Sequence, residues 1–305
     1  MWIIDYGLST INLIMNIALV TYFDEGKYTG EGTNEDIRLL AYLTAQGLQA
    51  TFAVWNDASV TWGNYDAVVL KSPWDYFDKI AEFKVWLQQL AKEQVPFLNP
   101  VSIVNWNLDK KYLLDIEQAG FSIVPTRIIP QNSFFAAEPF FEFWQTDTIL
   151  IKPAISGGAK NTFPIAASES ARLNHQVKEL VKTETYLVQP FMPEIQTQGE
   201  WSLLFFNGNF SHAVRKVPQR GDFRVQHFFG GEILLETPPP IIINYGQELV
   251  QKFAPGCLYA RVDGLESKGE FKLMELELIE PLLFLQQNEA LYENYYQALK
   301  ELLNI

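Results

Sequence analysis

A chain of 305 residues with 48% apolar and 14% aromatic residues can bury a substantial core, which disfavours disorder and predicts a soluble protein of two or three modules. Its net charge of −13 argues against nucleic acid as a partner, because phosphate backbones are bound by clustered Lys and Arg. The single cysteine, Cys257, cannot form an internal disulfide and no Cys/His cluster indicates zinc, so we expect a cytoplasmic protein that acts on small molecules.

The first 23 residues are apolar, but they do not read as a signal peptide or a membrane segment. They lack a basic first region, and Asp5, Asn12 and Asn16 interrupt the apolar run. The stretch MNIALVTYF, residues 15–23, instead predicts a first buried strand. We therefore expect residues 1–14 to form an extension outside the fold, and we expect no membrane partner.

Strands and helices then alternate as far as Gly120, which indicates βαβ units and an open, mostly parallel sheet. Pro125 bars a continuing helix, so we place a boundary near residue 122 and predict an α/β domain over 15–122. Its strands are predicted at 16–23, 48–55, 66–71 and around 97–98, and its helices at 33–46, 77–93 and 108–119. The second half changes to an α+β texture of antiparallel strands and hairpins, with a turn at Asn207 and Gly208.

The stretch IKPAISGGAKNTF, residues 151–163, ends a strand with Lys152 and continues into a glycine-rich loop. Glycines leave backbone N–H groups free to approach phosphate oxygens closely. The loop matches neither GxxxxGK[ST] nor GxGxxG, so a different phosphate-binding scaffold is needed. A plain surface lysine beside a turn is the alternative.

Two acidic segments follow, ARVDG at 260–264 and KLMELELIEP at 272–281. Because side chains alternate along a strand, Glu275 and Glu277 share one face, where their charges repel unless solvent or a cation screens them. If the segments pair as a hairpin, Asp263 reaches the same face and three hard oxygen ligands suit Mg²⁺ held with substrate phosphates. The alternative is a solvated acidic strand face.

Residues 212–232 form the most basic patch of the chain, with Arg215, Lys216, Arg220 and Arg224 among several glycines. A mobile loop that binds an anion would explain this composition, and ordinary solvated cations are the alternative. Upstream, YLVQPFMPE leads from a strand to Glu200. Its backbone groups could read an adenine edge and its carboxylate could bind ribose, although by itself the segment reads as an edge strand with a proline.

Together these segments resemble the ATP-grasp superfamily, in the branch of bacterial glutathione synthetase and the ligases that add glutamate to protein tails. The resemblance spans about Met15 to Leu285 and implies an ATP-grasp fold over 123–305, with a small lid subdomain at 123–190 and a C-terminal subdomain at 191–305. It also implies the roles of individual residues. The nucleotide-binding residues are Lys110 of LDKKYLL, Lys152, Ser156, Gly157, Gly158, the adenine hinge Gln189, Pro190, Phe191 and Met192, and the ribose-binding Glu200; the phosphate-contacting catalytic residues are Lys216 and Arg224; the metal ligands are Asp263, Glu275 and Glu277.

One departure concerns the substrate. Glutathione synthetases carry GD-x-R where this chain has Gly199, Glu200, Trp201 and Ser202, so the arginine of that motif is absent and glutathione synthesis is doubtful. In the first domain, KSPWDYFDK follows a buried strand, and functional residues gather beyond strand carboxyl ends. We therefore expect this segment, with Lys71, Trp74, Asp75 and Tyr76, to contact the acceptor, a structural aromatic corner being the alternative.

The resemblance implies an ATP-dependent carboxylate–amine ligase that forms an amide through an acylphosphate and releases ADP and phosphate. Its cofactors would be ATP and two Mg²⁺ ions, with Mn²⁺ able to substitute. Small-molecule or peptide carboxylates and amines are the expected partners, and a homo-oligomer is left open. A phosphotransferase and a non-catalytic nucleotide-binding protein are the alternatives.

Overall fold

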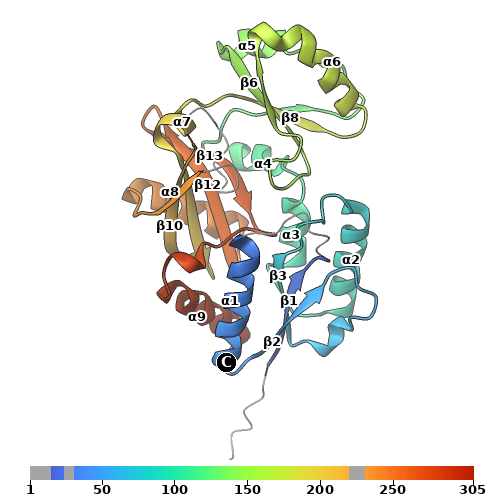
Figure 1. Ribbon diagram of the computed structural model, residues 1–305, viewed down its shortest axis with the longest axis vertical. Coiled ribbons are helices and arrows are strands. Elements are labelled where there is room, and N and C mark those ends of the chain that lie inside the picture. Colours follow the sequence, from blue (N-terminus) through green and yellow to red (C-terminus); the bar gives the residue numbers. More distant parts are fainter. Residues whose placement is uncertain (1–14, 24–30, 220–230) are drawn as a thin grey trace, which may run out of the picture.

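The computed structural model describes residues 15–23, 31–219 and 231–305, with backbone alone for residues 31–33. The predicted extension at 1–14, together with Arg220 and Arg224, lies outside the described residues. Three sheets follow one another along the chain, and helix α4 lies at the centre of the view between them (Figure 1). No helix in the described part of the chain combines the length and the apolar character that crossing a bilayer requires.

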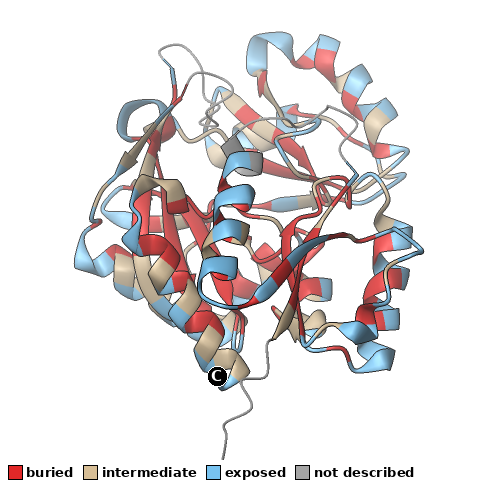
Figure 2. Ribbon diagram, turned by 60° about the horizontal axis from the view of Figure 1, so that its bottom comes forward, coloured by how far each residue is buried: buried red, intermediate tan, exposed pale blue. Residues whose placement is uncertain are grey.

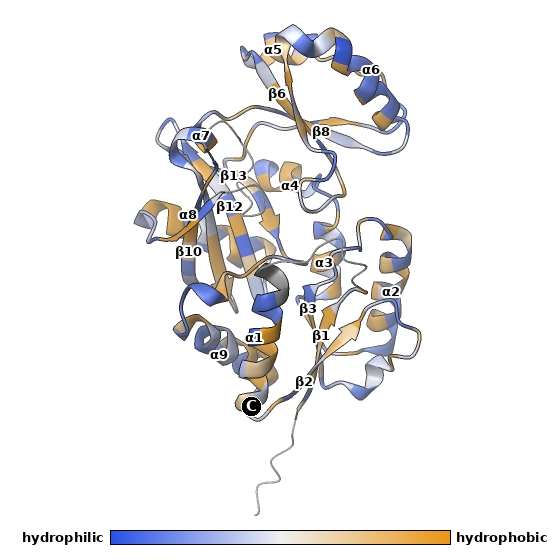
Figure 3. Ribbon diagram, viewed as in Figure 1, coloured by the Kyte–Doolittle hydropathy of each residue, from blue (hydrophilic) through white to orange (hydrophobic). Residues whose placement is uncertain are grey.

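The first sheet has the order β2-β1-β3-β4 and every pairing in it is parallel, which confirms the predicted parallel sheet. All six residues of β3 are buried, as is typical of a strand covered on both faces. β1 and β3 appear largely orange in Figure 3, which colours hydrophobic residues. The elements are β1 (Asn16–Thr21), α1 (Glu31–Ala45), β2 (Gln49–Val54), β3 (Ala67–Ser72), α2 (Ile80–Glu93) and β4 (Phe97–Leu98).

The helix predicted at 108–119 is wrong at its start, because the chain forms two short helices, α3 (Val101–Asn107) and α4 (Tyr112–Gln118). The link between them turns locally, since the Asp109 carboxylate accepts the N–H of Lys111 at 3.0 Å. The N–H of Lys110 leaves the helical pattern and donates to the carbonyl of Ala154 at 2.8 Å. This break places Lys110 beside the end of a strand in the second sheet.

The second sheet has the order β5-β8-β6-β7 and forms the part drawn at the top of Figure 1 together with helices α5 and α6. Its strand β8 lies between β5 and β6, so the reading of this segment as an edge strand was wrong. Pro190 is tolerated because it is the last residue of β8. The elements are β5 (Arg127–Ile129), α5 (Glu138–Trp144), β6 (Thr148–Pro153), β7 (Phe163–Ala166), α6 (Ser170–Val181) and β8 (Tyr186–Pro190).

The third sheet is antiparallel and has the order β11-β10-β9-β12-β13. The predicted turn at Asn207 and Gly208 is confirmed, and both residues have the positive φ that a two-residue hairpin favours, 44° and 75°. The elements are α7 (Glu194–Gln198), β9 (Glu200–Phe206), β10 (Asn209–Val217), β11 (Glu232–Leu235), α8 (Pro240–Phe253), β12 (Tyr259–Ser267), β13 (Glu270–Glu277) and α9 (Ala290–Leu303).

One hydrophobic core joins the first and third sheets, while the second sheet has a core of its own. Leu70 of β3 and Leu204 of β9 belong to the shared core, and the Tyr259 hydroxyl lies 2.8 Å from the carbonyl oxygens of both Leu70 and Ile279. Figure 2 shows these buried strands in red beneath exposed helices. The predicted boundary at residue 122 therefore divides two sheets that share a core.

Candidate functional site

Lys110 links the glycine-rich loop to the acidic strand. Its ammonium donates to the Ser156 carbonyl at 2.6 Å and lies 2.9 Å from Oε1 of Glu275. Burial alone disfavours its charge, but the charge of Glu275 outweighs burial and raises the pKa of Lys110. The sequence prediction that Lys110 and the glycine loop belong together thus matches a direct contact.

Lys152 is buried at the end of β6 with only 7% of its surface exposed, so it is not a plain surface lysine. Among the described residues its ammonium has one hydrogen bond, a long one of 3.5 Å to the carbonyl of Met274. Among the described residues no carboxylate lies within ion-pair distance of it. Burial lowers the pKa of Lys152, which the charge of Glu275 partly offsets. A buried ammonium with so little compensation is costly unless an anion completes its environment.

The glycine-rich loop packs against the segment that follows β3. A Cβ on Gly157 would come within 2.6 Å of Cε1 of Phe77 and 3.2 Å of Oε1 of Glu280, so only glycine allows this approach. Lys160 of the same loop pairs with Asp78 and lies over the Phe77 ring. The loop that was predicted to hold phosphate therefore also contacts the predicted acceptor segment.

The predicted adenine hinge uses its side chains inside the protein. The Gln189 amide donates to the Thr126 hydroxyl at 2.9 Å, and Gln189 is only 2% exposed. The N–H of Phe191 donates to the carbonyl of Thr148 at 3.0 Å, and Met192 packs in a small cluster with Ile195. Pro190 ends the strand, and Pro190, Phe191 and Met192 are each half-buried.

The three predicted metal ligands lie on one hairpin. Asp263 of β12 faces Glu275 of β13 in the strand register, and Glu277 faces Arg261. Asp263 is 3% exposed, so the solvated acidic face considered from the sequence is wrong for this residue. The Arg261 guanidinium donates three hydrogen bonds to Asp263, of 2.9, 3.0 and 3.1 Å, and also pairs with Glu277. Arg261 thus supplies the cation that keeps these carboxylates together.

A second cation reaches the hairpin from β10. Lys216 pairs with Glu200 and lies 3.6 Å from Oδ2 of Asp263, so the predicted catalytic lysine lies beside both the predicted ribose-binding residue and a predicted metal ligand. In this structure the Glu200 carboxylate forms an ion pair with Lys216, the residue predicted to contact phosphate. Ser202, at the position of the absent GD-x-R arginine, donates to Asp263. Arg224, the other predicted catalytic residue, lies outside the described residues.

The charges of the hairpin divide its carboxylates into two kinds. Burial opposes ionisation of Asp263, but Arg261 and Lys216 outweigh it and lower its pKa. For Glu275 burial is likewise outweighed by Lys110 and then Lys152, which lowers its pKa. For Glu277 burial prevails over Arg261 and raises the pKa to about 7. These carboxylates therefore lie close to Lys110, Lys152 and Lys216, the lysines that were predicted to bind phosphate.

The same carboxylates are candidate ligands for Mg²⁺. Among the described residues no group of three or more His, Cys, Asp and Glu forms a ready metal cage. Mg²⁺ is commonly held by one or two carboxylates together with substrate phosphates and water, which requires no such cage. Glu275 and Glu277, with side chains 28% and 26% exposed, are hard oxygen donors of this type. The donor set fits a metal that arrives with a nucleotide.

The predicted acceptor segment is used largely for internal contacts. Lys71 is buried and pairs with Glu35 and Asp36 of α1, each at 2.9 Å. Asp75 accepts the Trp55 indole N–H at 2.7 Å. These two side chains are therefore committed to the fold, which matches the structural alternative. Tyr76 is buried, and Trp74 is half-buried and donates to the Glu280 carbonyl at 3.3 Å.

Sequence reasoning did not select Arg261, Ser202 or Glu280. Arg261 stands two residues before Asp263 in the quoted ARVDG stretch, so strand alternation could have placed both side chains on one face. Glu280 was within the quoted acidic segment but beyond its strand. No local signal indicates Ser202, which only strand pairing brings beside Asp263.

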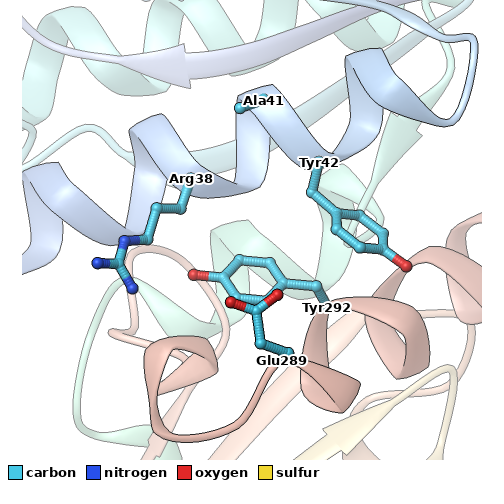
Figure 4. A pocket seen from close by; sticks show the side chains of 5 residues that line it. All are labelled: Arg38, Ala41, Tyr42, Glu289 and Tyr292. Atoms are coloured by element: carbon cyan, nitrogen blue, oxygen red, sulfur yellow. The ribbon is translucent and has the colours of Figure 1, made fainter.

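A separate pocket of about 300 Å³ lies between α1 and the start of α9 (Figure 4). Tyr42 and Tyr292 stack there with ring centroids 5.6 Å apart. No predicted site residue lines this pocket, which is bordered by Arg38, Ala41, Tyr42, Glu289 and Tyr292.

Comparisons with known proteins match this arrangement. Residues 17–99 match the family described as D-cycloserine synthetase DcsG, N-terminal domain, and residues 119–253 match prokaryotic glutathione synthetase, ATP-grasp domain. Residues 119–253 are thus similar to an ATP-grasp domain. This match confirms the resemblance predicted from the sequence.

Individual relatives agree with the ATP-grasp assignment. The cycloserine biosynthesis protein DcsG of Streptomyces lavendulae is 28% identical over 187 residues, which are 58% of this chain and 60% of that protein, so the match spans less than two thirds of the relative. The crystal structure of D-cycloserine synthetase DcsG has a TM-score of 0.84 at 24% identity and covers 94% of this chain and 99% of its own. D-alanine–D-alanine ligase from Bacillus anthracis, complexed with ATP, has a TM-score of 0.69 at 14% identity, with coverages of 95% and 97%. These likenesses show a shared fold.

Proposed function

We propose that the chain is an ATP-dependent carboxylate–amine ligase that forms an amide bond and releases ADP and phosphate. The observation that carries the proposal is Lys152, a buried ammonium whose hydrogen bond is a long contact to the Met274 carbonyl. An ATP phosphate would supply the missing anion. The placement of Lys110 and Glu275 close to the same loop supports a nucleotide there rather than an isolated anion.

The nucleotide would lie between the second and third sheets. Lys110, Lys152 and the loop of Ser156, Gly157 and Gly158 would bind its phosphates. Lys216 and Arg224 would neutralise charge on the transferred phosphoryl group, with Lys216 exchanging its contact to Glu200 for the nucleotide. Glu200 would then be released toward the ribose, and the backbone of 189–192 would meet adenine. The second sheet and its helices would act as the lid over this site.

Enzymes of this superfamily generally use ATP with Mg²⁺. Glu275, Glu277 and Asp263 would hold the metal, and two ions are proposed, with Mn²⁺ able to substitute. When bound, the metal supplies positive charge that stabilises the phosphates. The cations already paired with these carboxylates, Arg261 and Lys110, keep the donor set assembled beforehand.

The reaction would need positioning and charge balance more than acid–base chemistry. A substrate carboxylate oxygen attacks the γ-phosphorus, the bond to ADP breaks, and an acylphosphate forms. The amine nitrogen then attacks the acyl carbon, phosphate leaves, and the amine proton passes to solvent. The packing of the glycine loop on Phe77 supports exclusion of water, which would otherwise hydrolyse the acylphosphate.

The relatives suggest the size of the substrate. Two of the similar proteins, D-cycloserine synthetase and D-alanine–D-alanine ligase, are named after small compounds derived from amino acids. We propose a substrate of that class for this chain. Ser202, in place of an arginine, supports the exclusion of glutathione synthesis. The single cysteine supports a cytoplasmic location. A homo-oligomer also remains within the proposal.

The test is a screen of free amino acids, alone and in pairs, with Mg²⁺ and ATP. We expect one combination to release ADP and phosphate in equal amounts and to yield a product whose mass equals that of the substrates less water. Lys152→Met should lose this release. ADP accompanied by a phosphorylated product would indicate a phosphotransferase, and nucleotide binding without ADP release under every combination would count against a ligase.

A further inference from the structure

The carboxylate of Glu280 lies where three segments of the molecule meet. Glu280 follows the end of β13 by three residues. Its Oε1 lies 3.2 Å from the position that a Cβ on Gly157 would occupy, so the side chain adjoins the glycine loop. Its carbonyl accepts the Trp74 indole N–H at 3.3 Å, which ties the same residue to the segment after β3.

Glu280 has no cationic partner among the described residues. The neighbouring cations are committed elsewhere, Lys110 to Glu275 and Arg261 to Asp263 and Glu277. Glu280 is half-buried, so a ligand can reach it. Burial, followed by the charge of Glu277, raises the pKa of Glu280 to about 8, and a cation bound from solution would stabilise its carboxylate form.

The surroundings of Glu280 favour an organic ammonium. Trp74 contacts its backbone, Phe77 packs on the same glycine, and Tyr76 is close enough that the Glu280 charge, after burial, raises the tyrosine pKa. Aromatic rings beside a carboxylate are a typical environment for an ammonium group.

We propose that Glu280 binds the ammonium group of a small amino-acid substrate and so determines specificity for it. Because Glu280 borders both the glycine loop and the aromatic segment, the amino acid would lie between the transferred phosphoryl group and the first domain. This inference rests on the proposed function for the identity of the reaction. The binding role of Glu280 can be measured without turnover.

The experiment uses the full chain saturated with Mg²⁺ and a nonhydrolysable ATP analogue. Glycine and the D- and L-forms of alanine and serine are titrated by calorimetry, with their N-acetylated forms as uncharged probes. Glu280→Gln is compared with Glu270→Gln, a matched change at the exposed turn of the same hairpin. We expect at least one amino acid to bind wild type and the Glu270 variant, its N-acetylated form not to bind, and Glu280→Gln to weaken binding at least about tenfold.

Analogue affinity is measured for every variant and should change less than about twofold. If Glu280→Gln does not fold, Glu280→Asp, which keeps the charge on a shorter side chain, should still weaken amino-acid binding. The proposal is overturned if no amino acid binds wild type, if the N-acetylated form binds equally, or if the variants lose the analogue rather than the amino acid. Amino-acid binding without phosphate release would instead refute the ligase and leave the role of Glu280 standing.

Discussion

Two charge clusters, one between α1 and β3 and one on the β12–β13 hairpin, differ in how completely the protein compensates their charges. In the cluster of Lys71, Glu35 and Asp36, the Glu35 oxygens also accept the backbone N–H groups of Leu283 and Leu285 at 2.9 and 3.0 Å. Burial opposes the charge of Lys71, yet Asp36 and Glu35 outweigh it and raise the pKa of Lys71. Each charged side chain in this cluster is compensated by an ion pair or by backbone N–H groups of the chain.

The charges of the hairpin cluster of Asp263, Glu275 and Glu277 are compensated only in part, so we call it the open cluster and the cluster of Lys71 the closed cluster. Arg261 and Lys110 compensate the carboxylates, but the Glu275 and Glu277 side chains are 28% and 26% exposed. Lys152, beside them, has a single long hydrogen bond within the part of the chain that the structure describes. Closed compensation holds elements together, whereas open compensation leaves room for a charged ligand. The two clusters should therefore respond differently to loss of a charge.

The largest effect is expected from Glu275→Gln, which removes a proposed metal ligand from the open cluster. A neutral amide is a poor Mg²⁺ ligand, so kcat/KM should fall at least about 1,000-fold, on the order of 4 kcal/mol. Urea unfolding of the protein without ligand checks that the variant still folds, because the change also removes the carboxylate that pairs with the buried Lys110. Glu270→Gln, at the exposed hairpin turn, is the control and should keep wild-type turnover. Wild-type turnover in Glu275→Gln would refute the metal assignment.

The next effect concerns the closed cluster. Lys71→Met leaves the buried Glu35 and Asp36 without their cation, and breaking a buried pair in this way costs about 3 to 5 kcal/mol. The free energy of unfolding in urea measures the loss. Lys182→Met removes an exposed pair with Glu179 and should cost no more than about 0.5 kcal/mol. Equal stability of the two variants would show that the closed cluster does not hold the fold together.

The strands that hold both clusters could be predicted from the sequence, but the side chains that compensate their charges could not. Alternation placed Glu275 and Glu277 on one face, and the Lys268 and Gly269 turn fixed the hairpin that brings Asp263 opposite Glu275. These are local patterns of side-chain period and turn chemistry. They determine the acidic face without saying how its charge is compensated.

The partners could not be predicted because they come from distant segments. Lys71 looked like a substrate contact after its strand, and only the packing of α1 shows that Glu35 and Asp36 reach it. Ser202 meets Asp263 across 61 positions, through pairing of β9 with β12. The break between α3 and α4 likewise depends on the Ala154 carbonyl in another sheet. Tertiary contacts of this kind leave no periodic mark in the sequence.

A smaller effect tests the unpaired cation of the open cluster. Lys152→Met should weaken binding of a nonhydrolysable ATP analogue with Mg²⁺ by roughly 10- to 150-fold, because a charge-assisted contact contributes about 1.5 to 3 kcal/mol. Calorimetric titration measures the affinity, and the melting temperature without ligand checks the fold. Lys182→Met, an exposed change just after α6, should bind normally. Analogue binding at wild-type strength by a folded Lys152→Met would remove the phosphate role of Lys152.

The smallest expected effect tests whether the glycine loop packs against Phe77 of the aromatic segment. A methyl group at Gly157 would meet the Phe77 ring at 2.6 Å, so Gly157→Ala should destabilise the protein by about 1 kcal/mol, the lower end of overpacking costs, because the side chain can partly give way. Gly63→Ala is the control, since a Cβ there meets nothing within 4 Å. If the contact with Phe77 is the cause, Phe77→Leu should relieve it, and urea unfolding of both single variants and the double variant should reveal a coupling of at least about 0.5 kcal/mol. Additive effects would mean that the glycine loop does not press on Phe77. The contact between this loop and the aromatic segment would then be refuted.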